Sequence, residues 1–77
     1  NSRKRKALED ALLNLSKRQR ECIYYYFYQS MGYGEVASIM GLSSVKSARN
    51  LIYKSIDSLK SQLEPLKNNL LAIFFAL

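Results

Sequence analysis

The stretch Tyr33-Gly34-Glu35-Val36-Ala37-Ser38-Ile39-Met40-Gly41-Leu42-Ser43 decides how this chain folds. It predicts a helix over residues 33–40 that ends at Gly41, because glycine adopts a left-handed conformation without a Cβ clash. Ala37 predicts a close crossing with the next helix, since a larger side chain would hold the two apart. Ser43 or Ser44 can cap that next helix with its hydroxyl. Together these signals predict a helix-turn-helix. A tight corner in a small helical bundle is the alternative.

Composition limits the functions open to the chain. At 77 residues it can bury one modest core. Cys22 is its only cysteine, so no disulfide is expected, and its neighbours Ile23, Tyr26 and Phe27 predict a buried thiol in a reducing compartment. Histidine is absent, so the sequence supports no metal site, no cofactor and no Cys/His or Ser/His nucleophile. The six acidic residues are scattered rather than paired. The sequence therefore predicts a protein that is not an enzyme.

The basic residues favour a polyanionic partner. The formal net charge is +6, which by itself does not separate nucleic acid from acidic lipid. The distribution is more informative, because basic residues gather at residues 17–20 and 46–54, both at starts of expected helices. Helix starts already direct free N–H groups towards phosphate. A third group, residues 3–6, is interpreted as a solvated, frayed terminus.

Hydrophobic periodicity predicts an all-α fold, a compact four-helix domain that contains the helix-turn-helix. The first helix is expected over residues 4–14. A capping box between Ser16 and Gln19 is expected to open a second helix that runs to residue 30. Gly32 is expected to cap the third helix without the side-chain acceptor that serine would offer. The buried face of the second helix is expected to consist of Cys22, Ile23, Tyr26 and Phe27, with Tyr24, Tyr25 and Tyr28 packed at its flanks.

The fourth helix, expected over residues 44–63, carries the candidate binding residues. Its apolar residues advance by three or four and define the expected core face: Val45, Ala48, Ile52, Ile56, Leu59 and Leu63. The opposite face offers Lys46, Ser47, Arg49, Asn50, Tyr53 and Lys54 near the start of the helix. Arginine pairs with two acceptors on guanine, asparagine pairs with adenine, and lysine neutralises phosphate. This mixture predicts a helix that binds DNA.

Three motifs in one order mark a resemblance to a known family. The first is Leu8-Glu9-Asp10-Ala11-Leu12 with Leu15-Ser16-Lys17-Arg18-Gln19-Arg20-Glu21, the second is the stretch from Tyr33 to Ser43, and the third is Ser47-Ala48-Arg49-Asn50-Leu51. Together they resemble region 4 of bacterial RNA polymerase sigma factors, of the extracytoplasmic-function type. The resemblance runs from Leu8 to about Leu63. The link from Gly41 to Ala48 differs by one residue from family forms aligned with it, which leaves the register of the fourth helix open.

The resemblance implies binding of double-stranded promoter DNA at the minus-35 element, in transcription initiation in the cytoplasm. It also implies contact with the β flap of the RNA polymerase core and possible capture by an anti-sigma factor. The DNA-binding residues that it implies are Lys46, Ser47, Arg49, Asn50, Tyr53 and Lys54, with Arg20 and Tyr33 from the preceding helices. Ala37, Gly41 and Ser43 are expected to form the structural turn.

The C-terminal segment differs in composition, so the chain is divided into a DNA-binding domain, residues 1–64, and an apolar tail, residues 65–77. The run Leu70-Leu71-Ala72-Ile73-Phe74-Phe75-Ala76-Leu77 is too short to cross a bilayer, so no membrane insertion is expected. Pro65 can open a further helix, which either completes the core or supports self-association through residues 70–77. Since the chain lacks an initiator Met and a region for the other promoter element, it is expected to be one domain of a longer factor.

Two other functional classes fit parts of the pattern. A helix-turn-helix regulator of the LuxR type would use a similar module but would dimerise on a palindromic site. A protein-interaction module would bind a partner without reading DNA, and its complexes would be insensitive to salt. The shape of the DNA footprint and the salt dependence of binding separate these classes from a sigma factor.

Overall fold

The computed structural model describes residues 2–63 of the chain. These residues form four α-helices and one π-helical segment, joined by short links. They are α1 (Ser2–Leu13), α2 (Lys17–Ile23), η1 (Tyr24–Tyr28), α3 (Tyr33–Met40) and α4 (Val45–Gln62). No strand occurs between residues 2 and 63, and the all-α class predicted from the sequence is confirmed. The apolar tail, with its expected roles in core completion or self-association, lies outside the described residues.

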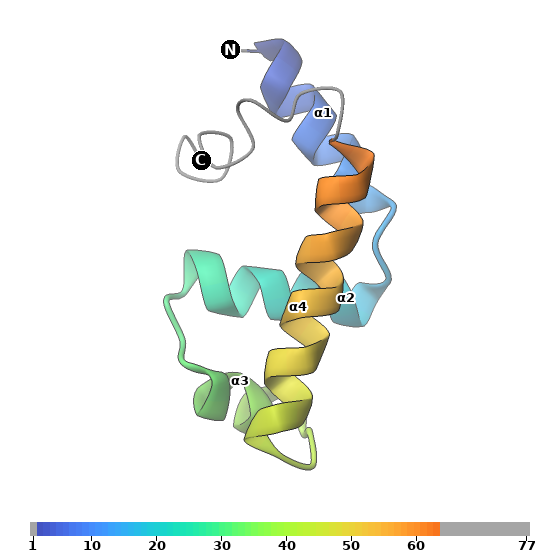
Figure 1. The fold of residues 1–77 in the computed structure, drawn as a ribbon. Helices are drawn as coiled ribbons and strands as arrows, with labels where there is room; N and C mark the ends of the chain where they lie inside the picture. The colour runs from blue at the N-terminus through green and yellow to red at the C-terminus, as the bar shows by residue number, and fades with distance from the viewer. Residues whose placement is uncertain (1, 64–77) are drawn as a thin grey trace.

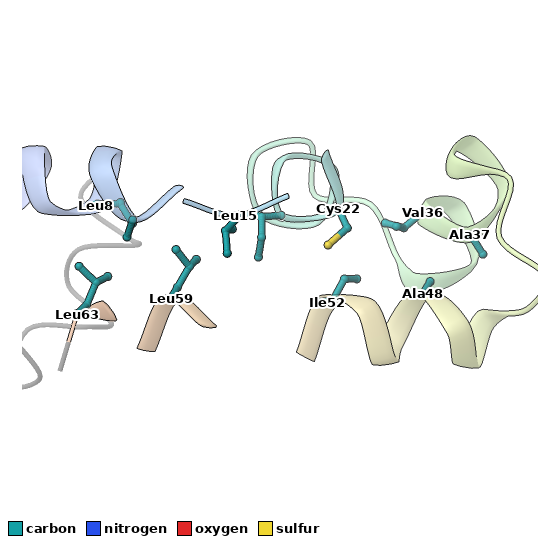
Figure 2. Close-up of a cluster of buried hydrophobic side chains, with 11 residues drawn as sticks. Leu8, Leu15, Cys22, Val36, Ala37, Ala48, Ile52, Leu59 and Leu63 are labelled. Carbon is teal, nitrogen blue, oxygen red and sulfur yellow. The ribbon is translucent and has the colours of Figure 1, made fainter. Parts of the chain in front are cut away.

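The long helix α4 is the element against which the other three α-helices pack (Figure 1). Helix α3 lies at its N-terminal end, α2 crosses near its middle, and α1 lies beside its C-terminal half. The buried side chains of the core are arranged in the same order along α4. In Figure 2, Val36 lies near Ala48, Cys22 points towards Ile52, and Leu8 and Leu15 lie on the side of Leu59 and Leu63. A single strip of side chains along α4 therefore holds the molecule together.

Local sequence signals account for the helix ends. Ser16 Oγ accepts from the Gln19 N–H at 3.2 Å, and Gln19 Oε1 accepts from the Ser16 N–H at 3.0 Å, so the predicted capping box is present. Gly32 caps α3 through its backbone, and the Glu35 carboxylate accepts from the Gly32 N–H at 3.0 Å. Ser44 caps α4, since its hydroxyl accepts from the Ser47 N–H at 3.0 Å.

The turn between α3 and α4 depends on Gly41. This residue ends α3 with φ 66° and ψ 34°, in the left-handed region that β-carbons disfavour. The following N–H, that of Leu42, donates back to the Ala37 carbonyl at 2.8 Å. Ala37 is buried in the core beside α4, so the two helices of the helix-turn-helix come close at this point.

The second helix is shorter than predicted. The expected α-helix to residue 30 ends at Ile23, and Tyr24–Tyr28 continue as a π-helix, with the Gln29 N–H donating to the Tyr24 carbonyl at 3.1 Å. Aromatic side chains lose χ1 freedom in an α-helix, so five in succession lower the α-helical propensity of this segment. The changed pitch also moves Phe27 off the predicted buried face, so its side chain is 39% exposed. Ser30, with φ 56°, then leaves the helix.

The core face of α4 also differs from the prediction at two residues. Val45 was expected in the core, but its side chain is 54% exposed, because it begins the helix beyond the part that α2 covers. Ser55 is fully buried instead. Its hydroxyl donates to the Leu51 carbonyl at 2.7 Å and lies 3.3 Å from Cys22 Sγ, so this polar group has partners where α2 crosses α4.

Candidate nucleic-acid interface

The outward face at the start of α4 brings together five of the predicted binding residues. Lys46, Arg49, Asn50, Tyr53 and Lys54 are all exposed, while Ala48 and Ile52 between them are fully buried. By helical periodicity, Lys46, Asn50 and Tyr53 share one line along the helix, with Arg49 and Lys54 on either side. We call these five residues the α4 face. It presents cations, an amide and a hydroxyl side by side, the groups that bind phosphates and base edges.

An acidic residue marks the far end of this face. Asp57 lies four residues after Tyr53, on the same outward line, and is exposed. A carboxylate there repels a phosphate backbone that runs further along α4. The five residues of the α4 face lie in the first turns of the helix, the part of a recognition helix that meets base edges in the major groove. Beyond Asp57, the exposed Lys60 restores a positive charge in the last turn.

Ser47 occupies a different position from the other predicted binding residues. It is half-buried, and its hydroxyl lies 3.0 Å from Ser44 Oγ and 3.2 Å from Ser43 Oγ. Its N–H also donates to the Ser44 cap. The three serines therefore tie the turn to the first residues of α4, and the structure places the Ser47 hydroxyl in this cluster.

Tyr33 and Tyr53 belong to a ladder of aromatic rings that crosses three elements. Tyr26 of η1 stacks on Tyr33 of α3 with centroids 5.3 Å apart and planes at 9°. Tyr33 in turn meets the edge of Tyr53 of α4 at 6.5 Å and 85°. Such contacts restrict the rings, so Tyr26 and Tyr33 hold Tyr53 on the α4 face. Tyr33 is half-buried, whereas Tyr53 is 53% exposed.

The electrostatics of this contact keep Tyr53 protonated. A hydrogen bond with Tyr33 raises the pKa of the Tyr53 hydroxyl above its ordinary value, and the charge of Arg49 opposes that shift. Since a tyrosine already titrates near pH 10, the hydroxyl is neutral at physiological pH, and its single proton is directed to Tyr33 in this structure. Burial also raises the pKa of Tyr28, in η1.

Arg20 has partners within the protein. Its Nη1 donates to the Leu15 carbonyl at 2.8 Å and to the Leu13 carbonyl at 3.3 Å, where α1 ends. The Leu13 carbonyl is one that a helix end leaves without an intrahelical partner, and the Leu15 carbonyl lies in the link that follows. Nothing in the sequence pattern pointed to this contact, because the spacing from Arg20 to these carbonyls follows no helical rule. The phosphate contact predicted for Arg20 remains a prediction.

The sequence interpretation missed Val45 as a surface residue of α4. It directly follows the Ser44 cap and precedes Lys46, so it lies at the edge of the α4 face. The available signal was its place as the first helical residue, one turn ahead of the fully buried Ala48. Periodicity alone assigned it to the core.

The described residues offer little other chemistry. Residues 2–63 contain no group of three His, Cys, Asp or Glu side chains that could hold a metal ion, and none of their helices is long and apolar enough to cross a membrane. Burial raises the pKa of the Cys22 thiol, although its hydrogen bond with Ser55 lowers it in part. A buried, protonated thiol is a poor nucleophile. The α4 face is thus the strongest candidate site.

Comparison with known proteins agrees with this geometry. A family model described as Sigma-70, region 4 matches residues 5–59, a range that includes the helix-turn-helix and the whole α4 face. No curated protein and no solved structure matches the chain. The matched range covers most of the 77 residues and leaves out the tail. This chain therefore belongs to the sigma-70 region 4 family, whose members are DNA-binding domains of transcription sigma factors and not enzymes.

Proposed function

We propose that this chain recognises the minus-35 element of promoter DNA by placing the start of α4 in the major groove. The observation that carries the proposal is the α4 face, where Arg49 and Asn50 lie among three further polar residues opposite the buried Ala48 and Ile52. In a helix-turn-helix the residues at the start of the second helix contact base edges. The family match and the net charge of +6 support the same partner.

Within this proposal the residues of the α4 face have distinct roles. Arg49 and Asn50 read base edges, since their side chains can each form two hydrogen bonds with a purine. Lys46 and Lys54 neutralise phosphates, and Tyr53 exchanges its hydrogen bond with Tyr33 for one to a phosphate oxygen. The aromatic ladder restricts Tyr53 before DNA arrives, which reduces the entropy lost on binding.

The proposal extends to the protein partners of the family. We propose that the domain acts in transcription initiation in the cytoplasm, as part of an extracytoplasmic-function sigma factor. Its partners would be the β flap of the RNA polymerase core and, in regulation, an anti-sigma factor. The motifs from Leu8 to Glu21 and from Tyr33 to Ser43 support this extension through their resemblance to region 4.

Competition binding tests the base-reading role. A preferred duplex is first selected from a random pool with the 77-residue chain, and every single-base variant of that duplex is then measured. Arg49→Ala should lose about 1–3 kcal/mol on the preferred site and relax discrimination at one base pair. Binding to random DNA should change little.

Lys54→Ala is the matched control, because it removes a charge from the same face without removing a base reader. It should weaken binding to all duplexes alike and reduce the slope of log K against log salt by roughly one. Uniform loss in Arg49→Ala would make Arg49 a phosphate contact. A palindromic footprint bound by a dimer would favour a LuxR-type regulator, and the lack of any salt-sensitive duplex binding would favour a protein-interaction module.

A further inference from the structure

Val45 is an exposed apolar residue at the edge of the polar α4 face. It is the first residue of α4, between the Ser44 cap and Lys46, and its side chain is 54% exposed. Single exposed apolar residues are common and by themselves imply nothing. Ile39, which is 52% exposed near the C-terminal end of α3, is an example in this same domain. Val45 differs in its place, since the first residues of a recognition helix are those that reach base edges.

The surroundings of Val45 leave part of its side chain open. Its Cγ2 lies 3.9 Å from the point that a Cβ on Gly34 would occupy, so one methyl group faces the start of α3. Gly34 has no side chain to cover Val45 further. The side chain is therefore seated against α3 on one side and accessible on the other, beside Lys46 and one helical turn before Arg49.

The major groove of B-DNA presents one apolar group, the 5-methyl of thymine. The cations and the amide of the α4 face match the polar acceptors and donors of the other base edges, whereas a valine matches only a methyl group. We propose that Val45 determines part of the DNA specificity by packing against the 5-methyl of a thymine. This inference rests on the proposed function, because it requires α4 to lie in the major groove.

The helix geometry limits where that thymine lies. Val45 and Arg49 are four residues apart, a rise of about 6 Å along α4. Successive base pairs are about 3.4 Å apart, so the thymine should lie within about two base pairs of the pair whose discrimination depends on Arg49. A selected site without thymine in that window would overturn the proposal.

Replacing thymine by deoxyuridine tests the contact directly, because it removes only the 5-methyl group. Each thymine of the selected duplex is replaced in turn, and binding is measured for the wild-type 77-residue chain and for Val45→Ala. The wild type should lose about fourfold in affinity at one position, the effect of burying one methyl-sized group. Val45→Ala should bind the methylated and unmethylated duplexes equally at that position. Alanine favours the helix at least as well as valine, so the variant should fold, which its circular dichroism checks.

Ile39→Ala is the matched control, since it shortens a similarly exposed apolar residue on α3. It should keep the full loss on deoxyuridine substitution. Two outcomes would contradict the thymine contact of Val45 without affecting the proposal of DNA binding. In the first, the wild type keeps its affinity after every deoxyuridine substitution. In the second, Val45→Ala loses as much affinity as the wild type at the same position. If the wild type binds no duplex at all, the proposed function itself fails.

Discussion

At the scale of single residues, two glycines of the helix-turn-helix have opposite conformational demands. Gly34 lies within α3, where helical angles suit any residue, and a Cβ there would meet Val45 Cγ2 at an ordinary 3.9 Å. Gly41 has φ 66°, and a Cβ there would meet nothing within 4 Å. Any cost of a side chain at Gly41 therefore comes from the backbone alone.

The two alanine variants should shift stability in opposite directions. Gly34→Ala should raise the free energy of unfolding by about 0.5–1 kcal/mol, because alanine loses less backbone entropy in a helix. Gly41→Ala should lower it by about 1 kcal/mol through the left-handed strain. Urea unfolding at one pH measures both. Gly41→Asn is the control and should cost less than alanine, since asparagine tolerates this conformation better. Shifts of the same sign in the two alanine variants would contradict the geometry.

A second residue-scale prediction concerns pH. Burial raises the pKa of the Cys22 thiol above its ordinary 9.0, so the folded state keeps a proton that the unfolded chain loses. The stabilisation from the neutral thiol is thus complete below about pH 9 and decreases as the pH rises towards the folded-state pKa. Cys22→Ala has no such contribution. The stability difference between wild type and variant should narrow from pH 8 to about pH 10.5 in urea unfolding.

This comparison cancels the other groups that titrate in the same range. Tyr28 and Tyr53, whose pKa values are also raised, are present in both proteins. A difference in stability that stays constant over the whole range would show that the thiol is not protected from ionisation by burial.

At the scale of elements, the end of α1 is joined to α2 and α4 by side chains. Arg20 Nη1 donates to the carbonyls of Leu13 and Leu15 from α2. From α4, Gln62 Nε2 donates to the Ala11 carbonyl at 3.3 Å, and Gln62 Oε1 accepts from Asn14 Nδ2 at 3.0 Å. These contacts satisfy polar groups at a helix end and set the direction in which the chain leaves α1.

Arg20→Met should therefore destabilise the domain. Methionine keeps an apolar stem but no donor, so the free energy of unfolding should decrease by about 1 kcal/mol. Arg18→Met, at an exposed position of the same helix, is the control and should change stability by less than about 0.5 kcal/mol. The salt slope of DNA binding, measured on the same variants, tests the phosphate contact predicted from the sequence. An unchanged stability with a reduced slope would make Arg20 a DNA contact rather than a link to α1.

At the scale of the whole molecule, α4 has two functions on opposite faces. Its buried face supplies the strip of core that joins α1, α2 and α3, and its exposed face carries the candidate DNA contacts. A domain of this size has a free energy of unfolding of only several kcal/mol. Damage to the buried face therefore removes the binding surface as well, because the helix that carries it no longer has a fixed position.

Two isoleucines allow this dependence to be measured. Ile52→Ala removes a fully buried side chain and should cost about 2–5 kcal/mol, enough to unfold much of the population and abolish duplex binding. Ile39→Ala, at a position that is 52% exposed, should cost less than about 0.5 kcal/mol. Thermal unfolding followed by a binding isotherm reports both effects. Normal DNA affinity in an unfolded Ile52→Ala would contradict the link between core and interface.

The amino-acid sequence by itself determined the features that depend on a few neighbouring residues. The capping box at Ser16, the ends of α3 and the turn of the helix-turn-helix all follow from hydrogen bonds of side chains and backbone that reach three to five residues along the chain. The polar residues of the α4 face were also identified from periodicity. For these features the interacting groups are close in sequence, so the pattern contains the information.

The tertiary structure decided which residues are covered by neighbouring helices and which stay exposed. Val45 is exposed and Ser55 buried because α2 crosses α4 near its middle and does not reach its first turn. Arg20 contacts the end of α1 because the link between the two helices places α2 beside the Leu13 and Leu15 carbonyls. Helical periodicity shows which side of a helix is apolar, but it does not show how much of that side a neighbouring helix covers. The covered length depends on where the other helices begin, end and cross.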